Sequence, residues 1–97
     1  MRFQHDEKEK VVNELYKAVV QISSEEECEQ FFIDICTPKE IESLAQRLYV
    51  AKLLRKEVTY NEIEKMTGAS TVTISRVSKA LKNGQSGYPT ILERLGE

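Results

Sequence analysis

The chain has 97 residues, of which 40% are hydrophobic and 31% are charged, and its formal net charge is −2. A chain of this length forms one domain, residues 1–97, with only a modest core. No apolar run approaches the roughly 20 residues that span a bilayer, and the charged N-terminus does not resemble a signal peptide, so we expect a cytoplasmic protein with no membrane partner.

Charge is unevenly distributed along the chain. Residues 1–36 carry four basic and nine acidic side chains, a net charge of −5, whereas residues 37–97 carry ten basic and seven acidic side chains, a net charge of +3. A polyanionic partner such as nucleic acid would therefore bind the C-terminal part, and the N-terminal part has another task.

The N-terminal third predicts two amphipathic helices. The only histidine, His5, lies in a stretch that we expect to be frayed. Helical periodicity runs from about Glu7 to Ile22, and a second helix follows Ser24, whose side chain can cap it while Glu27 closes a capping box. The apolar positions of the two helices are Val11, Leu15, Ala18, Val19, Ile22, Cys28, Phe31, Phe32, Ile35 and Cys36. The spacing of the two cysteines matches neither a metal site nor a redox pair, so we expect buried free thiols.

A third helix begins clearly at Thr37-Pro38-Lys39-Glu40, which supplies a cap, a proline in the first turn and a glutamate at the box position. It runs to about Lys56, and apolar residues occur all round it: Ile41, Leu44, Ala45, Leu48, Tyr49, Val50, Leu53 and Leu54. A helix that is apolar on several sides is buried on several sides. In so short a chain the simplest cover is a second copy, so we expect a homodimer built from the helices of residues 7–56.

Residues 59–82 predict two short helices joined by a tight turn. Thr59 and Glu62 can form a capping box at the start of the first helix. Gly68 stands where the chain must turn sharply, and we expect it to have a positive φ, which glycine adopts without steric cost. Ser70 can cap the second helix through its hydroxyl.

The second of these helices has two different faces. Ile74, Val77 and Leu81 share one side at the helical period. The opposite side carries small and basic residues: Thr71, Val72, Ser75, Lys79 and Lys82. No acidic residue occurs between positions 68 and 88. The pair matches a helix-turn-helix, although an ordinary αα-hairpin with a solvated face is the alternative.

In a helix-turn-helix the second helix enters the major groove of double-stranded DNA, and its N-terminal residues meet base edges. Short Thr and Ser side chains can contact base edges or a thymine methyl group, and Lys can reach phosphates. The residues expected to contact DNA are Tyr60, Asn61, Ser70, Thr71, Val72, Thr73, Ser75, Arg76, Lys79 and Lys82. We expect sequence recognition from Thr71, Val72 and Ser75.

The remaining segment predicts a short sixth helix. Asn83-Gly84 ends the preceding helix, residues 85–87 form a link, and residues 89–96 place Ile91, Leu92 and Leu95 on one side. Six helices and no strand make the class all-α. The sequence contains no catalytic triad, carboxylate pair, metal-ligand cluster or glycine-rich phosphate loop, so an enzyme is disfavoured.

Several short motifs occur in a fixed order between residues 37 and 82: Thr37-Pro38-x-Glu40, Leu44, Arg47, Leu53-Leu54-Arg55, Glu62-Ile63, Gly68-Ala69, Thr73-Ile74-Ser75-Arg76-x-Ser78 and Leu81-Lys82. Together they resemble the Trp repressor family, specifically its YerC/YecD-like branch in Gram-positive bacteria. The resemblance implies an intertwined six-helix homodimer that binds palindromic operators. We therefore expect a transcriptional regulator, specifically a repressor, that is associated with the nucleoid.

The resemblance also implies an altered ligand pocket. In tryptophan-responsive members two arginines sandwich the indole ring, and Arg47 and Arg76 match them; structural bonds to helix-end carbonyls or a carboxylate are the alternative role. Val77 replaces a glycine that leaves room for the ligand, and Ala80 replaces a serine that helps to hold its amino group. Losing a bond to a charged group costs about 1.5–3 kcal/mol. We therefore expect that tryptophan is not the corepressor, with Val77 as a substitute for the ligand or with a different small ligand.

Three further points bear on the DNA-binding interpretation. Glu64 would repel phosphate if it faced the duplex, so the operator is expected to differ from that of tryptophan-responsive members. The alternative function is a dimeric adaptor that keeps the fold, binds a protein through its acidic N-terminal half and has no specific DNA affinity. Isolated helix-turn-helix units also occur in sigma factors and transposases. The long helical first half of this chain disfavours both of these protein classes.

Overall fold

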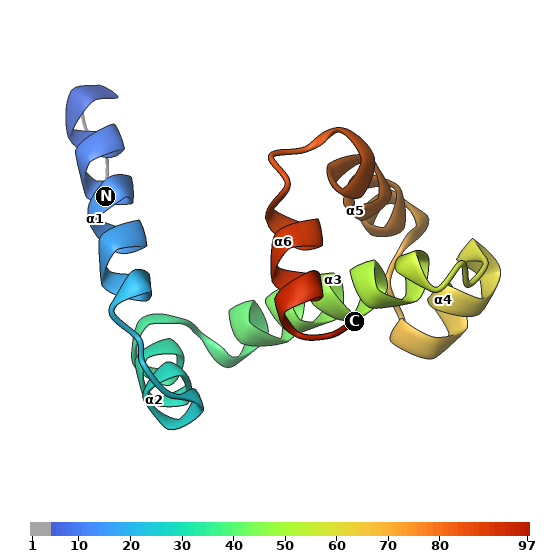
Figure 1. Cartoon of the computed structure of the whole chain (residues 1–97), viewed down its shortest axis with the longest axis horizontal. Helices are drawn as coiled ribbons and strands as arrows, with labels where there is room; N and C mark the ends of the chain where they lie inside the picture. Colours follow the sequence, from blue (N-terminus) through green and yellow to red (C-terminus); the bar gives the residue numbers. More distant parts are fainter. Residues whose placement is uncertain (1–4) are drawn as a thin grey trace. The chain divides into compact units, whose positions relative to one another are not determined.

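The structure, a computed structural model, describes residues 5–97 (Figure 1). The described residues form six α-helices and no strand: α1 His5–Val20, α2 Glu25–Ile35, α3 Pro38–Arg55, α4 Tyr60–Thr67, α5 Thr71–Asn83 and α6 Gly87–Arg94. The predicted all-α class and the six helices are therefore confirmed. The chain divides into two compact units, Met1–Thr37 and Pro38–Glu97. Because Thr37 is uncharged, the net charges of −5 and +3 are those of the two units.

Two helices have bounds that differ from the prediction. The helix α1 begins at His5, in the stretch that was expected to be frayed, and the rest of that stretch lies outside the described residues. It ends at Val20 because the next two N–H groups bond three residues back, as in a tighter 3₁₀ turn. The helix α6 begins two residues early, at Gly87, because Ser86 adopts a left-handed conformation, φ +68°, that redirects the chain.

The start of α2 is capped as predicted, with one change of partner. The Ser24 hydroxyl accepts a hydrogen bond from the Glu27 N–H at 3.1 Å. The Glu27 carboxylate, however, bonds Ser23 rather than Ser24: it accepts from the Ser23 N–H at 3.1 Å and from the Ser23 hydroxyl at 2.9 Å. These two bonds lower the pKa of Glu27 below its ordinary value.

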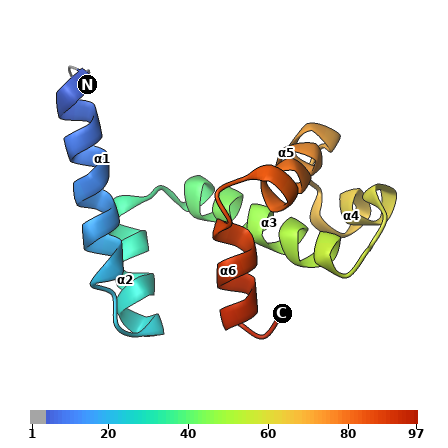
Figure 2. The same ribbon diagram turned by 45° about the horizontal axis from the view of Figure 1, so that its top comes forward.

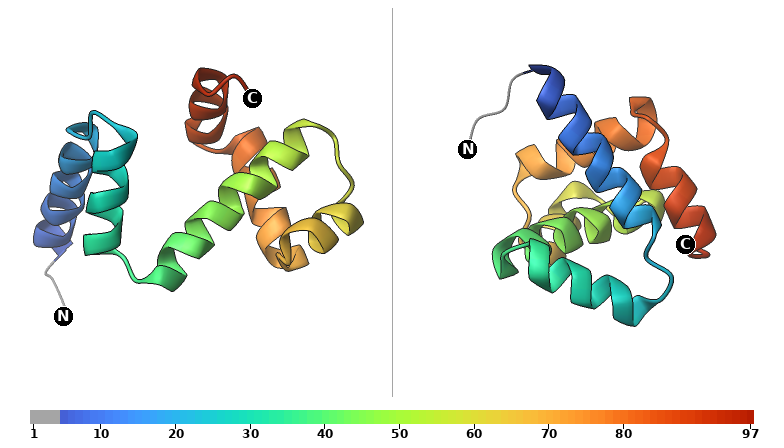
Figure 3. Two further views of the ribbon diagram at one scale, coloured as in Figure 1. Left: turned by 90° about the horizontal axis from the view of Figure 1, so that it is seen from below. Right: turned by 90° about the vertical axis from the view of Figure 1, so that its left-hand side faces the viewer.

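The first unit buries none of the side chains described in it, residues 7–37. Apolar side chains stay accessible within it, with Leu15 42%, Ile33 61% and Val20 78% exposed. The rings of Phe31 and Phe32 pack edge to face with centroids 6.2 Å apart. The two cysteines are free thiols, as expected, but they are half-buried rather than buried. Figure 3 shows α1 and α2 as two distinct helices joined by a short loop.

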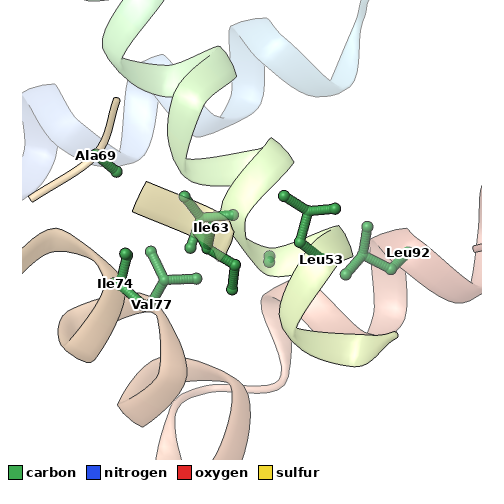
Figure 4. Packing of buried hydrophobic residues seen from close by; sticks show 8 residues of the cluster. Leu53, Ile63, Ala69, Ile74, Val77 and Leu92 are labelled. Atoms are coloured by element: carbon green, nitrogen blue, oxygen red, sulfur yellow. The ribbon is translucent and has the colours of Figure 1, made fainter. Parts of the chain in front are cut away.

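The second unit has a core around the C-terminal half of α3. This helix contacts α4, α5 and α6, and the α4–α5 pair lies beside it (Figure 2). The buried apolar side chains come from all four helices and from the turn between α4 and α5 (Figure 4): Val50, Ala51, Leu53, Ile63, Ala69, Ile74, Val77 and Leu92. Fully burying one aliphatic side chain of this kind contributes about 1.5–3 kcal/mol, so this cluster stabilises the second unit.

The N-terminal half of α3 has no such cover within its unit. No residue from Pro38 to Tyr49 is buried, and Leu44 is 43% and Tyr49 42% exposed. Figure 3 shows the first turns of α3 extending beyond α4, α5 and α6. Only three residues of this helix are buried, namely Val50, Ala51 and Leu53.

Candidate nucleic-acid interface and the adjoining cleft

The helices α4 and α5 form the predicted helix-turn-helix. The Thr59 hydroxyl accepts a hydrogen bond from the Glu62 N–H at 3.3 Å and so caps α4. Gly68 ends α4 with a φ of +72°, in the left-handed region that favours glycine, and its N–H donates to the Glu64 carbonyl at 2.9 Å. The predicted glycine conformation is present, and so is the Thr59 half of the predicted capping box, whereas the Glu62 carboxylate makes no bond back to Thr59. The local sequence therefore sets both ends of α4.

The turn between the two helices is held by a network that sequence analysis did not find. The Thr67 hydroxyl donates to the Ile63 carbonyl at 2.7 Å and accepts from the N–H of buried Ala69 at 3.1 Å. The Gln46 side chain, from α3, donates to the Thr67 carbonyl at 3.1 Å. Gln46 thus satisfies a carbonyl at the end of α4, which would lack a partner within the helix. No local pattern signals this contact, because 21 residues separate its partners.

The first turn of α5 uses two of the residues that we expected to contact DNA. The Ser70 hydroxyl accepts from the Thr73 N–H at 3.2 Å, which is the predicted cap, and donates to the Thr73 hydroxyl at 3.2 Å. Thr73 is half-buried. The hydroxyls of both residues are therefore engaged within the protein, although Ser70 itself is exposed. Thr71, Val72 and Ser75 are exposed in the first turns of α5.

The outward face of α5 is exposed along its whole length. Its exposed residues are Thr71, Val72, Ser75, Arg76, Lys79 and Lys82. On α4, Tyr60 and Asn61 are also exposed, whereas Glu64 is half-buried. The opposite side of α5 packs into the core through Ile74 and Val77. The face thus joins small and basic side chains on a rigid helix, which is an arrangement suited to base edges and phosphates.

A cleft lies next to this face, between α3, α5 and α6. Its volume is about 330 Å³, and it is lined by Arg47, Thr73, Arg76, Val77, Ala80 and Tyr88. The structure therefore brings together all four residues that the family resemblance implied for a pocket. Thr73 was missed as a lining residue, although it lies one helical turn before Val77. Tyr88 carried no signal, because its position depends on the left-handed conformation of Ser86.

The charges in the cleft are uncompensated within the described chain. Arg47 and Arg76 are both exposed, and neither makes a hydrogen bond or an ion pair with any residue in the range 5–97. Val77 is only 2% exposed and belongs to the core. It also forms one wall of the cleft, whose volume remains open beside it. Two unpaired guanidinium groups at an open cleft suit an anionic group.

An apolar groove adjoins the cleft and shares two lining residues with it. Its volume is about 480 Å³. It is lined by Leu48, Ala80, Gln85, Gly87, Tyr88 and Ile91. Ile91, which was expected on the inner side of the last helix, is 47% exposed here. Leu92, which was expected on the same side, is fully buried, whereas Leu95, the third residue expected there, is 56% exposed.

Comparison with known proteins identifies the family. A model of the family described as Trp repressor protein matches residues 10–96. The chain belongs to the Trp repressor family. Membership indicates a DNA-binding regulator that dimerises, not an enzyme. Among the described residues, no helix is long and apolar enough to cross a membrane.

Three relatives illustrate how closely the chain follows the family. The uncharacterized protein YerC of Bacillus subtilis is 48% identical over 88 residues, which are 91% of this chain and 85% of YerC. The crystal structure of a TrpR-like protein from Eubacterium eligens matches with a TM-score of 0.84 and 47% identity over 90% of both chains. A candidate Trp repressor from Staphylococcus aureus, also known from a crystal structure, matches with a TM-score of 0.84 and 45% identity over 97% of this chain and 96% of the other.

Proposed function

We propose that this protein is a sequence-specific transcriptional regulator, and specifically a repressor, that binds a palindromic operator as a homodimer in the cytoplasm. The observation that carries the proposal is the outward face of α5, where exposed small and basic side chains follow a capped helix start on a helix that has no acidic residue. A helix of this kind fits the major groove, and basic side chains on it neutralise phosphates.

We assign a role to each segment of the chain from the distribution of apolar surface. Residues 7–56 form the dimer, residues 59–82 bind DNA, and residues 89–96 complete the fold. The first unit buries no described side chain, and the first half of α3 is uncovered within its own unit. Such surface needs a partner in a small protein, and an intertwined second copy supplies it.

The proposed DNA contacts are of two kinds. Thr71, Val72 and Ser75 face base edges, because they are exposed at the N-terminal end of α5. Lys79 and Lys82 reach phosphates further along the helix, and Tyr60 and Asn61 support them from α4. Ser70 and Thr73 act indirectly, since their hydroxyls fix the start of α5. Arg76 lines the cleft and is within one turn of these residues, so either a ligand or a phosphate can engage it.

We also propose that tryptophan is not the corepressor. Val77 forms a wall of the cleft where a ligand ring would need space, and Ala80 offers no side-chain hydrogen bond to an amino group. An anionic ligand other than tryptophan is the alternative, and the two unpaired arginines of the cleft favour it.

Selection of genomic DNA fragments by the purified protein, with and without added tryptophan, tests both proposals. We expect recovery of one palindromic motif, unchanged by tryptophan. Recovery that requires tryptophan, or micromolar binding of tryptophan in titration calorimetry, would contradict the second proposal alone. Failure to recover any motif at moderate salt would contradict the first and support the protein-binding adaptor.

A further inference from the structure

One residue on the outward face of α5 has no polar atom in its side chain. Val72 is the second residue of α5 and is 61% exposed. The other aliphatic residues in the first two turns, Ile74 and Val77, are buried in the core on the opposite side of the helix. Val72 is therefore the only large apolar side chain that this part of α5 presents outward.

The position of Val72 is fixed by the local backbone. Val72 lies at the N-terminal end of α5, the end that would meet base edges. The cap formed by Ser70 and Thr73 fixes the backbone of this first turn. A valine in a helix has one strongly preferred χ1 rotamer because it branches at Cβ. Its two methyl groups thus point in a direction that the fold determines, on the helix face that also carries exposed Ser75 three residues on.

The chemistry of the major groove leaves one feature that such a side chain can recognise. Base edges there present hydrogen-bond donors, acceptors and, on thymine alone, the C5-methyl group. A valine can neither donate nor accept a hydrogen bond. We propose that Val72 recognises the C5-methyl group of a thymine in each half-site of the operator. This inference depends on the proposed function, because it requires α5 to lie in the major groove.

Deoxyuridine scanning of the operator tests this inference. Each thymine of the selected operator is replaced in turn by deoxyuridine, which lacks only the methyl group, and the affinity of the whole protein is measured. We expect a loss of about fourfold for each half-site at the position that Val72 contacts, which corresponds to burial of one methyl group. A loss at any other thymine, such as one contacted by Thr71, should persist in Val72→Ala. The Val72→Ala protein should bind the thymine operator more weakly and should no longer distinguish thymine from deoxyuridine at that position.

Matched variants make the result specific. Val72 is exposed and alanine is the better helix former, so Val72→Ala should fold, as a thermal melt will show. Ser75→Ala, on the same face, should keep the thymine preference at the position assigned to Val72. Specific binding with no sensitive thymine, or an unchanged preference in Val72→Ala, would overturn the inference and leave the proposed function intact. Absence of any specific operator would instead overturn the proposed function.

Discussion

Single residues determine the geometry of the turn between α4 and α5. Gly68 has a left-handed backbone, and an added Cβ would meet no atom within 4 Å. The cost of replacing it is therefore one of backbone conformation rather than of space. Sequence analysis identified this position because a glycine directly after a helix is the residue that most readily adopts the left-handed conformation.

Substitutions at Gly68 should separate conformation from crowding. Gly68→Val should lower the free energy of unfolding by about 1–2 kcal/mol or more, since a β-branched residue tolerates positive φ poorly. Gly68→Asn is the matched control, because asparagine enters the left-handed region more easily, and it should cost less. Urea denaturation measures both values. Equal losses for the two variants would contradict the conformational explanation.

Two exposed residues of α5 should have separable effects on DNA binding. Ser75→Ala should change the preference for particular bases by about 1–3 kcal/mol for each base that the hydroxyl touches. Lys82→Ala should weaken binding to all sequences alike and reduce the salt dependence by about one counterion for each protomer. Both side chains are exposed, so neither change should unfold the protein. Unchanged affinity and preference in both variants would show that another surface binds DNA.

At the scale of elements, helix ends follow the local sequence closely. The caps at Ser24, Thr59 and Ser70 were all predicted, because a cap needs only a side chain and a backbone N–H two or three residues on. The partner of Glu27 was predicted one residue away from its true position, since adjacent serines offer competing donors. The Gln46 hydrogen bond and the lining role of Tyr88 were not predictable, because both depend on how separate helices pack.

The bonds of Glu27 to Ser23 should make α2 sensitive to acid. Two donors from Ser23 lower the pKa of Glu27 in the folded chain. Its contribution is therefore fully present above the ordinary glutamate range and is lost as the pH falls through the lowered pKa. Wild-type protein should exceed Glu27→Gln in stability at pH 7, and the difference should disappear on acidification. Glu26→Gln, which removes a neighbouring charge but no bond to Ser23, is the control; an identical pH profile would contradict this assignment.

At the scale of the whole molecule, the sequence predicts a dimer, whereas the structure is that of a single chain. The excess of apolar residues on the first three helices predicted a dimer, and the structure leaves that surface accessible, with no described side chain of the first unit buried. The cleft residues were grouped correctly through the family resemblance rather than by periodicity. Val77 belongs to the core, as its place beside Ile74 and Leu81 predicts, and the cleft keeps a volume of about 330 Å³ beside it, so the alternative of a different small ligand stays open.

The apolar surface of the first unit should support self-association. Leu15 is 42% exposed in the single chain, and its replacement by glutamate places a charge in the proposed interface. Sedimentation should find a dimer for the wild type and a weakened dimer for Leu15→Glu, with a loss of operator affinity. Glu14→Gln is the neighbouring control and should leave the dimer intact. A wild-type monomer at micromolar concentration would contradict the proposed assembly.

The central claim is that the outward face of α5 binds DNA, and the most direct test is affinity as a function of salt. Fluorescence anisotropy would compare the selected operator with a scrambled duplex of equal length between about 50 and 200 mM salt. Over this range the phosphate contacts of Lys79 and Lys82 in two copies would lose about 10² in affinity, and more if Arg76 also binds phosphate. We predict a steep loss for both duplexes, with the operator bound more tightly throughout. No detectable affinity for either duplex at moderate salt would contradict the account and favour a protein-binding adaptor.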